Sequence, residues 1–277
     1  MEIANRIAVV TGGASGVGRS LCHGLAERGA AAVVVCDIEG EGAAKVAAEL
    51  EASGHRAVAV TADVSSEADV QALVQRAEEA FGRVDLFFSN AGIIVAGGPE
   101  ASDEAWFRIW AINVQSHVYV ARAVLPGMLA RGEGYLVITA SAAGLLTQLG
   151  SAPYAVTKHA AVALAEWLAI THGDEGIRVS CLCPQAFTSN LLATSRREVG
   201  ADQLAETGSA GGSAQAAVDG VLTSDQVAAS VLDAIGSEEF LILPHPEVAG
   251  MYAGRAADTD RWLRGMSKVQ RRLEELG

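Results

Sequence analysis

Tyr154 and Lys158 stand four positions apart and are the residues of this sequence best suited to moving a proton. On a helix, that spacing places both side chains on one face. A free phenol, with a pKa of about 10, keeps its proton at neutral pH, but a nearby ammonium favours the phenolate. The pair could then take a proton from an alcohol or donate one to a ketone.

Two more polar residues could act beside this pair. Ser141 follows the apolar run Leu136–Ala140, an expected strand, so its hydroxyl would lie at the carboxyl end and could stabilise charge on a substrate oxygen. Asn113 interrupts an apolar helical stretch and could be a tolerated polar residue. Taken singly, Ser141 could also cap a turn, Lys158 could be solvated, and Tyr154 could be a packing residue.

A glycine-rich segment precedes the first expected helix, Thr11-Gly12-Gly13-Ala14-Ser15-Gly16-Val17-Gly18. Glycines let a backbone approach a pyrophosphate closely, and the free N–H groups of a helix N-terminus attract anions. A glycine cluster alone also marks ordinary tight turns. Its position between a strand and a helix favours a dinucleotide site.

Asp37 closes the second apolar run, where its carboxylate could accept hydrogen bonds from ribose hydroxyls. The same charge would repel a 2′-phosphate, so we expect NAD rather than NADP. Arg19 could soften that repulsion, but neither Ser15 nor Ile38 is basic. As an alternative, Asp37 could simply form the Asp-Ile-Glu-Gly turn.

Short apolar runs alternate with alanine-rich helical stretches along the chain, which is typical of a parallel sheet covered on both faces. The expected strands are Ile7–Val10, Ala32–Cys36, Ala57–Thr61, Val84–Phe88, Leu136–Thr139, Val179–Leu182 and Phe240–Leu243. The expected helices are Gly16–Arg28, Gly40–Ser53, Glu67–Phe81, Asp103–Leu129, Tyr154–His172 and Ser224–Ile235. The sequence therefore predicts an α/β fold, a single-domain Rossmann-type doubly wound sheet of about seven parallel strands with helices on both faces.

Two segments lie outside this alternation. The polar stretch Ala193–Gly220 predicts a mobile substrate loop, bounded at about residues 189–222, with a short helix at Glu198–Ala205. Pro246–Gly277 is a C-terminal extension with an amphipathic helical pattern, expected to cover a core edge or join a subunit interface. No repeat or Pro-rich linker divides the chain, so residues 1–277 should form one catalytic domain.

Composition narrows the function classes. With 33 acidic and 20 basic residues, the net charge of -13 opposes nucleic-acid binding. The start of the chain lacks a signal-peptide pattern and no apolar run could span a bilayer, so we expect a cytoplasmic protein with no membrane partner. Cys22, Cys36, Cys181 and Cys183 lack metal-site spacing, so no metal is expected. The last two would share one strand face as small apolar residues.

Together these motifs resemble those of the short-chain dehydrogenase/reductase family. The matching elements are the Thr-Gly-x-x-x-Gly-x-Gly loop from Thr11 to Gly18, Asp63-Val64, Asn90-Ala91-Gly92, Asn113, Ser141 and Tyr154-x-x-x-Lys158. They come in the family's order and span about Arg6 to Pro244, so a chance coincidence of them all is negligible. The resemblance implies a nicotinamide-dependent oxidoreductase and favours the catalytic interpretation of the four polar residues.

The resemblance also implies roles for single residues. Tyr154 would be the acid–base residue, with its pKa lowered by Lys158 and by an oxidised nicotinamide ring. Ser141 would bind the substrate oxygen, and Asn113 would hold a water linking Lys158 to solvent. The implied cofactor contacts are Gly12, Ser15, Gly16, Val17, Gly18, Asp37, Ile38, Asp63, Val64, Asn90, Ala91, Gly92, Tyr154, Lys158, Pro184, Phe187 and Ser189.

Two departures from the family pattern bear on the site. Ser89 replaces the first of two asparagines that usually precede Ala-Gly, an exchange that should matter little. Pro184-Gln185-Ala186-Phe187-Thr188-Ser189 replaces the usual Pro-Gly-x-Val-x-Thr, which places an amide at the substrate entrance. The expected substrate pocket is largely apolar and contains Ile94, Ala143, Leu149, Gln185 and Leu192.

We expect NAD-dependent interconversion of a secondary alcohol and a ketone, on a hydrophobic or aromatic substrate. A 3-oxoacyl-thioester reductase and a non-catalytic NAD(H)-sensing protein remain the alternatives. By analogy with the family, we expect a homotetramer or homodimer, packed through Asp103–Leu129 and Tyr154–His172. The sequence does not identify the substrate, its stereochemistry or the physiological direction.

Overall fold

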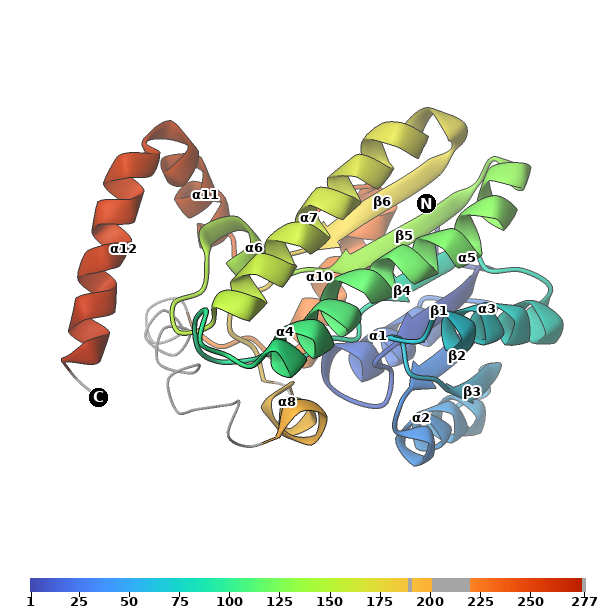
Figure 1. Ribbon diagram of the computed structural model, residues 1–277. Coiled ribbons are helices and arrows are strands. Elements are labelled where there is room, and N and C mark those ends of the chain that lie inside the picture. Colours follow the sequence, from blue (N-terminus) through green and yellow to red (C-terminus); the bar gives the residue numbers. More distant parts are fainter. Residues whose placement is uncertain (189–190, 201–219, 276–277) are drawn as a thin grey trace.

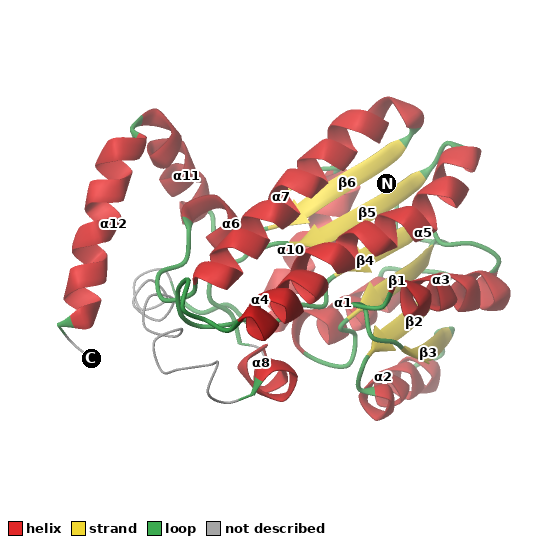
Figure 2. Cartoon of the chain, viewed as in Figure 1, coloured by secondary structure: helices red, strands yellow, loops and turns green. Residues whose placement is uncertain are grey.

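The structure is a computed structural model that describes residues 1–188, 191–200 and 220–275, without the side chains of residues 192, 193, 273 and 274. Its centre is one sheet of seven parallel strands in the order β3-β2-β1-β4-β5-β6-β7, drawn in yellow in Figure 2. The strands are β1 (Ile7–Thr11), β2 (Ala32–Asp37), β3 (Ala57–Thr61), β4 (Leu86–Ser89), β5 (Gly134–Thr139), β6 (Ile177–Leu182) and β7 (Leu241–Ile242). This confirms the expected doubly wound sheet.

Helices cover both faces of the sheet (Figure 1). One face carries α1 (Gly16–Glu27), α2 (Gly40–Ala52) and α10 (Ser224–Ser237), and the other carries α3 (Glu67–Phe81), α5 (Ser116–Arg131) and α7 (Ala152–His172). Side chains alternate along a strand, so Val9 of β1 packs into one core while Ala8 and Val10 pack into the other. The strand order reverses between β1 and β4, where ligands of such sheets bind.

The helix expected over Asp103–Leu129 is interrupted. The structure has α4 (Asp103–Trp110), a π-helical turn η1 (Ala111–Gln115) and then α5. Asn113 lies in that turn, and its side-chain amide hydrogen-bonds the backbone of Ile93 in both directions, at 2.9 Å each. Single π-helical turns inside helices are rare overall but frequent at functional sites, and this one carries the side chain that is paired with Ile93.

The C-terminal extension forms two helices, α11 (Glu247–Ala257) and α12 (Thr259–Glu274). Asp258 separates them, and its carboxylate accepts a hydrogen bond of 2.9 Å from the backbone N–H of Arg261, which caps α12. Val248 is fully buried and Trp262 packs against the core, so the extension does cover a core edge. Figure 1 shows α12, in red, standing beside the main body.

The structure has a helix α8 (Leu191–Val199) within the segment expected to form the substrate loop. Most of that loop, and residues 201–205 of the short helix expected at Glu198–Ala205, lie outside the described residues. The remaining short elements are α6 (Ala143–Leu146) and η2 (Gly173–Glu175). In the described ranges, no helix is long and apolar enough to cross a membrane.

Candidate active site

A cavity of about 930 Å³ opens at the carboxyl edge of the sheet. Ser189 and the side chain of Leu192 lie outside the described residues. The sequence-predicted site residues that line the cavity are Gly12, Ser15, Gly16, Val17, Gly18, Asp37, Ile38, Asp63, Val64, Asn90, Ala91, Gly92, Ile94, Ser141, Ala143, Leu149, Tyr154, Lys158, Pro184, Gln185 and Phe187. Residues from across the chain therefore meet at one place, as the strand-end argument predicts.

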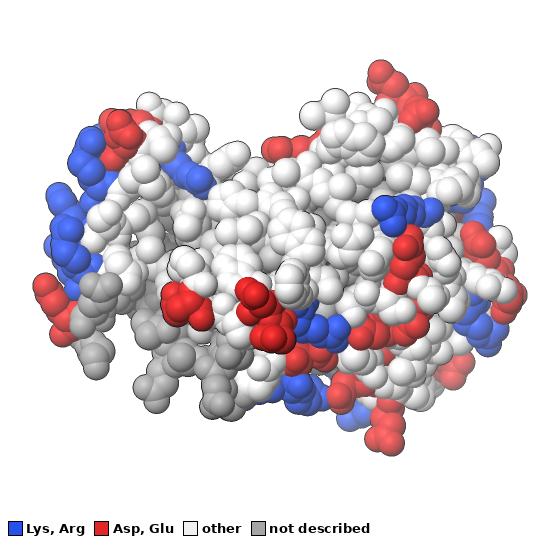
Figure 3. Space-filling model, in the orientation of Figure 1, with Lys and Arg blue, Asp and Glu red and all other residues white. Residues whose placement is uncertain are grey.

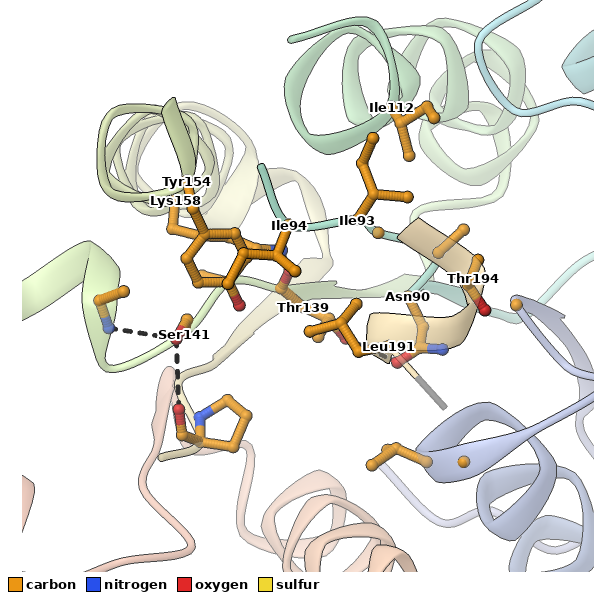
Figure 4. A pocket seen from close by; sticks show the side chains of 18 of the residues that line it. Asn90, Ile93, Ile94, Ile112, Thr139, Ser141, Tyr154, Lys158, Leu191 and Thr194 are labelled. Atoms are coloured by element: carbon orange, nitrogen blue, oxygen red, sulfur yellow. Dashed lines mark hydrogen bonds between the residues drawn. The ribbon is translucent and has the colours of Figure 1, made fainter. Parts of the chain in front are cut away.

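Tyr154 and Lys158 project into this cavity from the first turns of α7 (Figure 4). Lys158 Nζ lies 5.6 Å from the centre of the Tyr154 ring and donates a hydrogen bond of 2.9 Å to the carbonyl of Thr139. The ammonium is thereby fixed beside the phenol and at the end of β5. The four-residue spacing on a helix does place both side chains on the same face.

Ser141 is held from two sides. Its hydroxyl accepts a hydrogen bond of 3.1 Å from the backbone N–H of Ala143 and donates one of 3.4 Å to the carbonyl of Pro184. Figure 4 shows it on the same side of the cavity as Tyr154. The hydroxyl and the phenol can therefore reach one substrate oxygen between them, which is the arrangement that proton transfer to or from that oxygen requires.

Burial dominates the protonation of this pair. It raises the pKa of Tyr154, and the hydrogen bond from Ser141 offsets only part of that rise. Burial also lowers the pKa of Lys158 to about 8. The lowered phenol pKa expected from the sequence is thus not produced by these side chains alone, because losing contact with water disfavours the phenolate.

Asn113 is fully buried and does not line the cavity. Its amide nitrogen also donates to the hydroxyl of Thr157, at 3.3 Å, besides pairing with Ile93. A methyl group built on Gly92 would lie 3.3 Å from Asn113 Oδ1 and 3.4 Å from Lys158 Nζ. Asn113 is therefore placed just behind the lysine, and its relay through a water remains a prediction.

The glycine loop forms a close-fitting cradle. Gly12 has a φ of +67°, a region that side chains rarely adopt. A methyl group on Gly18 would lie 2.0 Å from the carbonyl oxygen of Gly12, so the loop closes only without it. Ser15 caps α1 without a side-chain hydrogen bond, which leaves the first N–H groups of the helix available to an anion. The cradle fits a pyrophosphate.

Asp37 combines the two interpretations offered by its sequence position. One carboxylate oxygen accepts a hydrogen bond of 3.0 Å from the backbone N–H of Glu39, which forms the turn. The other accepts one of 3.0 Å from the N–H of Ala14, which ties β2 to the glycine loop. Arg19 does not line the cavity and pairs with Glu49 at 2.8 Å. The carboxylate of Asp37 therefore faces the cavity without a neutralising contact from Arg19.

Arg108, to which no role was assigned from the sequence, joins Asp63 to Glu198 at the wall of the cavity. Arg108 of α4 pairs with the carboxylate of Asp63 at 3.2 Å and with that of Glu198 of α8 at 2.5 Å. Burial alone would raise the pKa of Asp63, but hydrogen bonds from Ser65 and the charge of Arg108 lower it overall. Because Asp63, Arg108 and Glu198 come from three segments far apart in the sequence, no local pattern reveals this cluster.

Comparison with known proteins identifies the family. A family model described as short chain dehydrogenase matches residues 6–200. The chain belongs to the short-chain dehydrogenase family. The sequence-based resemblance is therefore confirmed, and the protein is an oxidoreductase by family.

The relatives that this short-chain dehydrogenase matches include several proteins named as dehydrogenases of alcohols. The 1-deoxy-11-beta-hydroxypentalenate dehydrogenase of Streptomyces exfoliatus is 35% identical over 251 residues, 89% of this chain and 86% of the relative. The cyclohexanol dehydrogenase of an Acinetobacter species is 37% identical over 191 residues, 68% of this chain and 76% of the relative. A family member from Burkholderia phymatum, solved in complex with NAD, matches with a TM-score of 0.84 at 32% identity, covering 94% of this chain and 96% of that one.

Ser89, the first departure from the family pattern, has a specific partner in this short-chain dehydrogenase. Its hydroxyl lies 2.6 Å from Nδ1 of His117, a fully buried residue of α5. Burial, and then the charge of Lys158, lowers the pKa of His117 to about 3, so the imidazole is neutral at physiological pH. The pair joins β4 to α5, near enough to Lys158 for that charge to act on the imidazole. Neither residue was assigned a role from the sequence, where the exchange to Ser89 was expected to matter little.

The C-terminal extension also reaches the site, which the sequence did not indicate. Trp262, Met266, Val269 and Arg272 of α12 line the cavity together with Met251 of α11. Cys181 and Cys183 stay outside it, with their sulfur atoms 3.8 Å apart in the core, as their shared strand face predicts. Among the described residues, no three His, Cys, Asp or Glu gather where they could hold a metal.

Proposed function

We propose that this short-chain dehydrogenase uses NAD to interconvert a secondary alcohol and its ketone. The observation that carries the proposal is the meeting of Tyr154, Lys158 and Ser141 in the cavity that also contains the glycine cradle. A phenol, an ammonium and a hydroxyl around one space suit proton transfer at a carbinol oxygen. Family membership supports the same reaction class.

In the oxidative direction, the phenolate of Tyr154 takes the hydroxyl proton of the substrate. When held by the glycine cradle, the oxidised cofactor would accept the hydride that leaves the carbinol carbon. Ser141 holds the substrate oxygen by a hydrogen bond while its charge changes. Lys158 lies beside the ring, and its charge together with that of an oxidised nicotinamide would offset the burial that raises the pKa of Tyr154, because positive charges nearby favour the phenolate. In reduction, Tyr154 returns the proton to the oxygen.

NAD rather than NADP is supported by Asp37, whose carboxylate would repel a 2′-phosphate. Arg197 of α8 also lines the cavity, but it is paired with Glu39, so its charge is already compensated. The relative solved with NAD agrees with this choice. We expect a kcat/KM for NAD at least tenfold that for NADP; a preference for NADP would instead favour the 3-oxoacyl-thioester reductase.

An alicyclic alcohol is the substrate type we propose. Ile94, Leu149 and Met251 line the cavity with apolar side chains, and the relatives named above act on cyclohexanol and on a hydroxypentalenate. The experiment is a rate assay that follows NADH absorbance with a panel of cyclic secondary alcohols. Turnover would support the proposal, whereas a silent panel with intact NADH binding would favour the sensing protein.

We also propose that the enzyme is a homotetramer or homodimer. Large apolar side chains are exposed on α4 and α7, among them Phe107 at 73%, Trp167 at 57% and Ile170 at 83%. Exposed apolar patches on a protein surface often mark contact surfaces. Helix α4 forms the start of the expected interface segment Asp103–Leu129, and α7 contains the other segment, Tyr154–His172. Light scattering tests this proposal, because a mass of one chain would contradict it.

A further inference from the structure

One face of α12 borders the catalytic cavity. Trp262, Met266, Val269 and Arg272 line that cavity and follow each other at intervals of four and three residues, which places them in one stripe along the helix. The first two side chains are half-buried, and Val269 is 39% exposed. From Trp262 to Arg272 the stripe covers about 15 Å at a helical rise of about 1.5 Å per residue. It is apolar over most of its length and ends in a guanidinium.

Arg272 differs from the other cations of the cavity. Lys158 is hydrogen-bonded to a carbonyl, Arg108 is paired with two carboxylates, and Arg197 is paired with one. Arg272, in contrast, makes no ion pair or hydrogen bond with any residue that the structure describes. An unpaired guanidinium on a cavity wall can bind a carboxylate through two parallel hydrogen bonds.

The positive charge of α12 as a whole also favours an anionic ligand. Figure 3 shows basic side chains along the outer edge of the molecule over α12, where Arg261, Arg264, Lys268, Arg271 and Arg272 lie. The chain as a whole has a net charge of -13, so this helix is a basic element on an acidic protein. Such a local field raises the concentration of anions near the cavity.

We propose that α12 forms the outer wall of the substrate site and that Arg272 binds the carboxylate of a substrate whose carbinol lies on an apolar ring system. The inference rests on the proposed function and narrows its substrate class. Trp262 and Met266 would pack against the rings, since an aromatic face and a flexible thioether adapt well to alicyclic surfaces. A stripe of about 15 Å favours fused rings over a single small ring.

The test compares each ring acid with its own methyl ester, which differs only in lacking the charge. The probes are lithocholate, a hydroxysteroid carboxylate, and 4-hydroxycyclohexanecarboxylate, each with its ester. We expect the kcat/KM of wild type to be higher for the acid than for its methyl ester, at least in the fused-ring pair. Arg272→Gln should lower the acid-to-ester ratio of kcat/KM about tenfold. Arg271→Gln is the matched control, because Arg271 is adjacent and exposed but does not line the cavity. An unchanged ratio in Arg272→Gln, or an equal loss in Arg271→Gln, would overturn the assignment.

The wall is tested separately by Trp262→Ala. We expect its KM for the steroid methyl ester to rise about fivefold relative to its KM for cyclohexanol. Leu263→Ala is the control, because Leu263 is 57% exposed and does not line the cavity. Equal effects of both variants, or none from Trp262→Ala, would contradict the wall. Melting temperatures of both variants identify any loss of folding.

Calorimetric titration keeps this inference distinct from the proposed function. The acid and the ester are titrated into the enzyme in the presence of NADH, without turnover. If wild type binds the acid more tightly, and Arg272→Gln does not, the substrate-class inference holds even where no probe is oxidised. If turnover occurs with no preference for the acid in either assay, the proposed function stands and the inference fails.

Discussion

Lys158 Nζ donates a hydrogen bond of 2.9 Å to the carbonyl of Thr139, the last residue of β5. This contact fixes the helix that carries Tyr154 to the strand that leads into Ser141. It also keeps the ammonium at 5.6 Å from the phenol ring centre, in a buried environment that lowers the pKa of Lys158 to about 8. The charge needed for catalysis is thus maintained at a cost to stability.

Lys158→Met should separate the contribution of the ammonium to catalysis from its cost to stability. Turnover should fall by at least about 100-fold, because without the ammonium Tyr154 loses the phenolate form, and acid–base catalysis usually contributes at least that much. In the unfolded chain the lysine pKa is 10.5, so between pH 8 and 10.5 the unfolded state binds more protons and the stability of wild type rises with pH. The variant lacks the buried charge, so its melting temperature should exceed that of wild type by the largest margin near pH 7. That margin should shrink towards pH 10. A difference independent of pH would contradict the buried ammonium.

His117→Gln should change the response to acid. The pKa of His117 is about 3 in the folded protein and 6.5 in the unfolded chain, so stability that is present at pH 7 is lost as pH falls from 6.5 towards 3. At pH 7 the free energy of unfolding of the variant should be about 1 kcal/mol lower, because the hydrogen bond to Ser89 is lost. Between pH 6.5 and 3 its free energy of unfolding should fall less steeply than that of wild type. Chemical denaturation at each pH measures both quantities. His55→Gln, at a half-buried histidine outside this pair, is the control, and it should keep the wild-type slope.

Arg108→Gln should weaken cofactor binding more than chemistry. Arg108 holds the carboxylates of Asp63 and Glu198 together at the cavity wall, and without it two acidic groups repel each other there. We expect the KM for NAD to rise about three- to tenfold with little change in kcat. Arg122→Gln removes a more exposed pair with Glu67 and serves as the comparison. A loss confined to kcat would show that the cluster acts elsewhere.

Gly18→Ala should abolish NADH binding. The added methyl group would lie 2.0 Å from the carbonyl of Gly12, so the cradle must open. The same substitution at Gly236, a position in α10 with open space around it, should leave binding unchanged and slightly stabilise the helix. Fluorescence titration with NADH distinguishes the two variants. Tight binding by Gly18→Ala would mean that the pyrophosphate lies away from this loop.

Much of the fold could be predicted from the sequence because its signals are local. Apolar runs such as Ala32–Cys36 mark buried parallel strands, and the glycine loop before α1 has few other uses. The interruption at η1 was missed, since Asn113 is drawn into place by the backbone of Ile93, a contact between segments 20 residues apart. Helix periodicity carries no information about such a partner.

Those parts of the site that depend on local spacing could also be predicted from the sequence, and the others could not. Tyr154 and Lys158 show their relation through spacing on one helix, whereas Arg108 and Glu198 meet only in three dimensions. The stripe on α12 has the amphipathic pattern of a helix that covers a core, and that pattern does not tell a core edge from a cavity wall. The roles of the cradle and the acid–base residues remain predictions that mutation can test.

The most direct test of the central claim is the rate of NADH formation by wild type and by Tyr154→Phe, with NAD and cyclic secondary alcohols. The phenylalanine ring keeps the shape of the side chain and removes the hydroxyl that moves the proton. We predict that wild type turns over and that the variant loses at least about 100-fold in kcat while binding NADH as tightly. Equal turnover by the two proteins would contradict the assignment of Tyr154 as the acid–base residue.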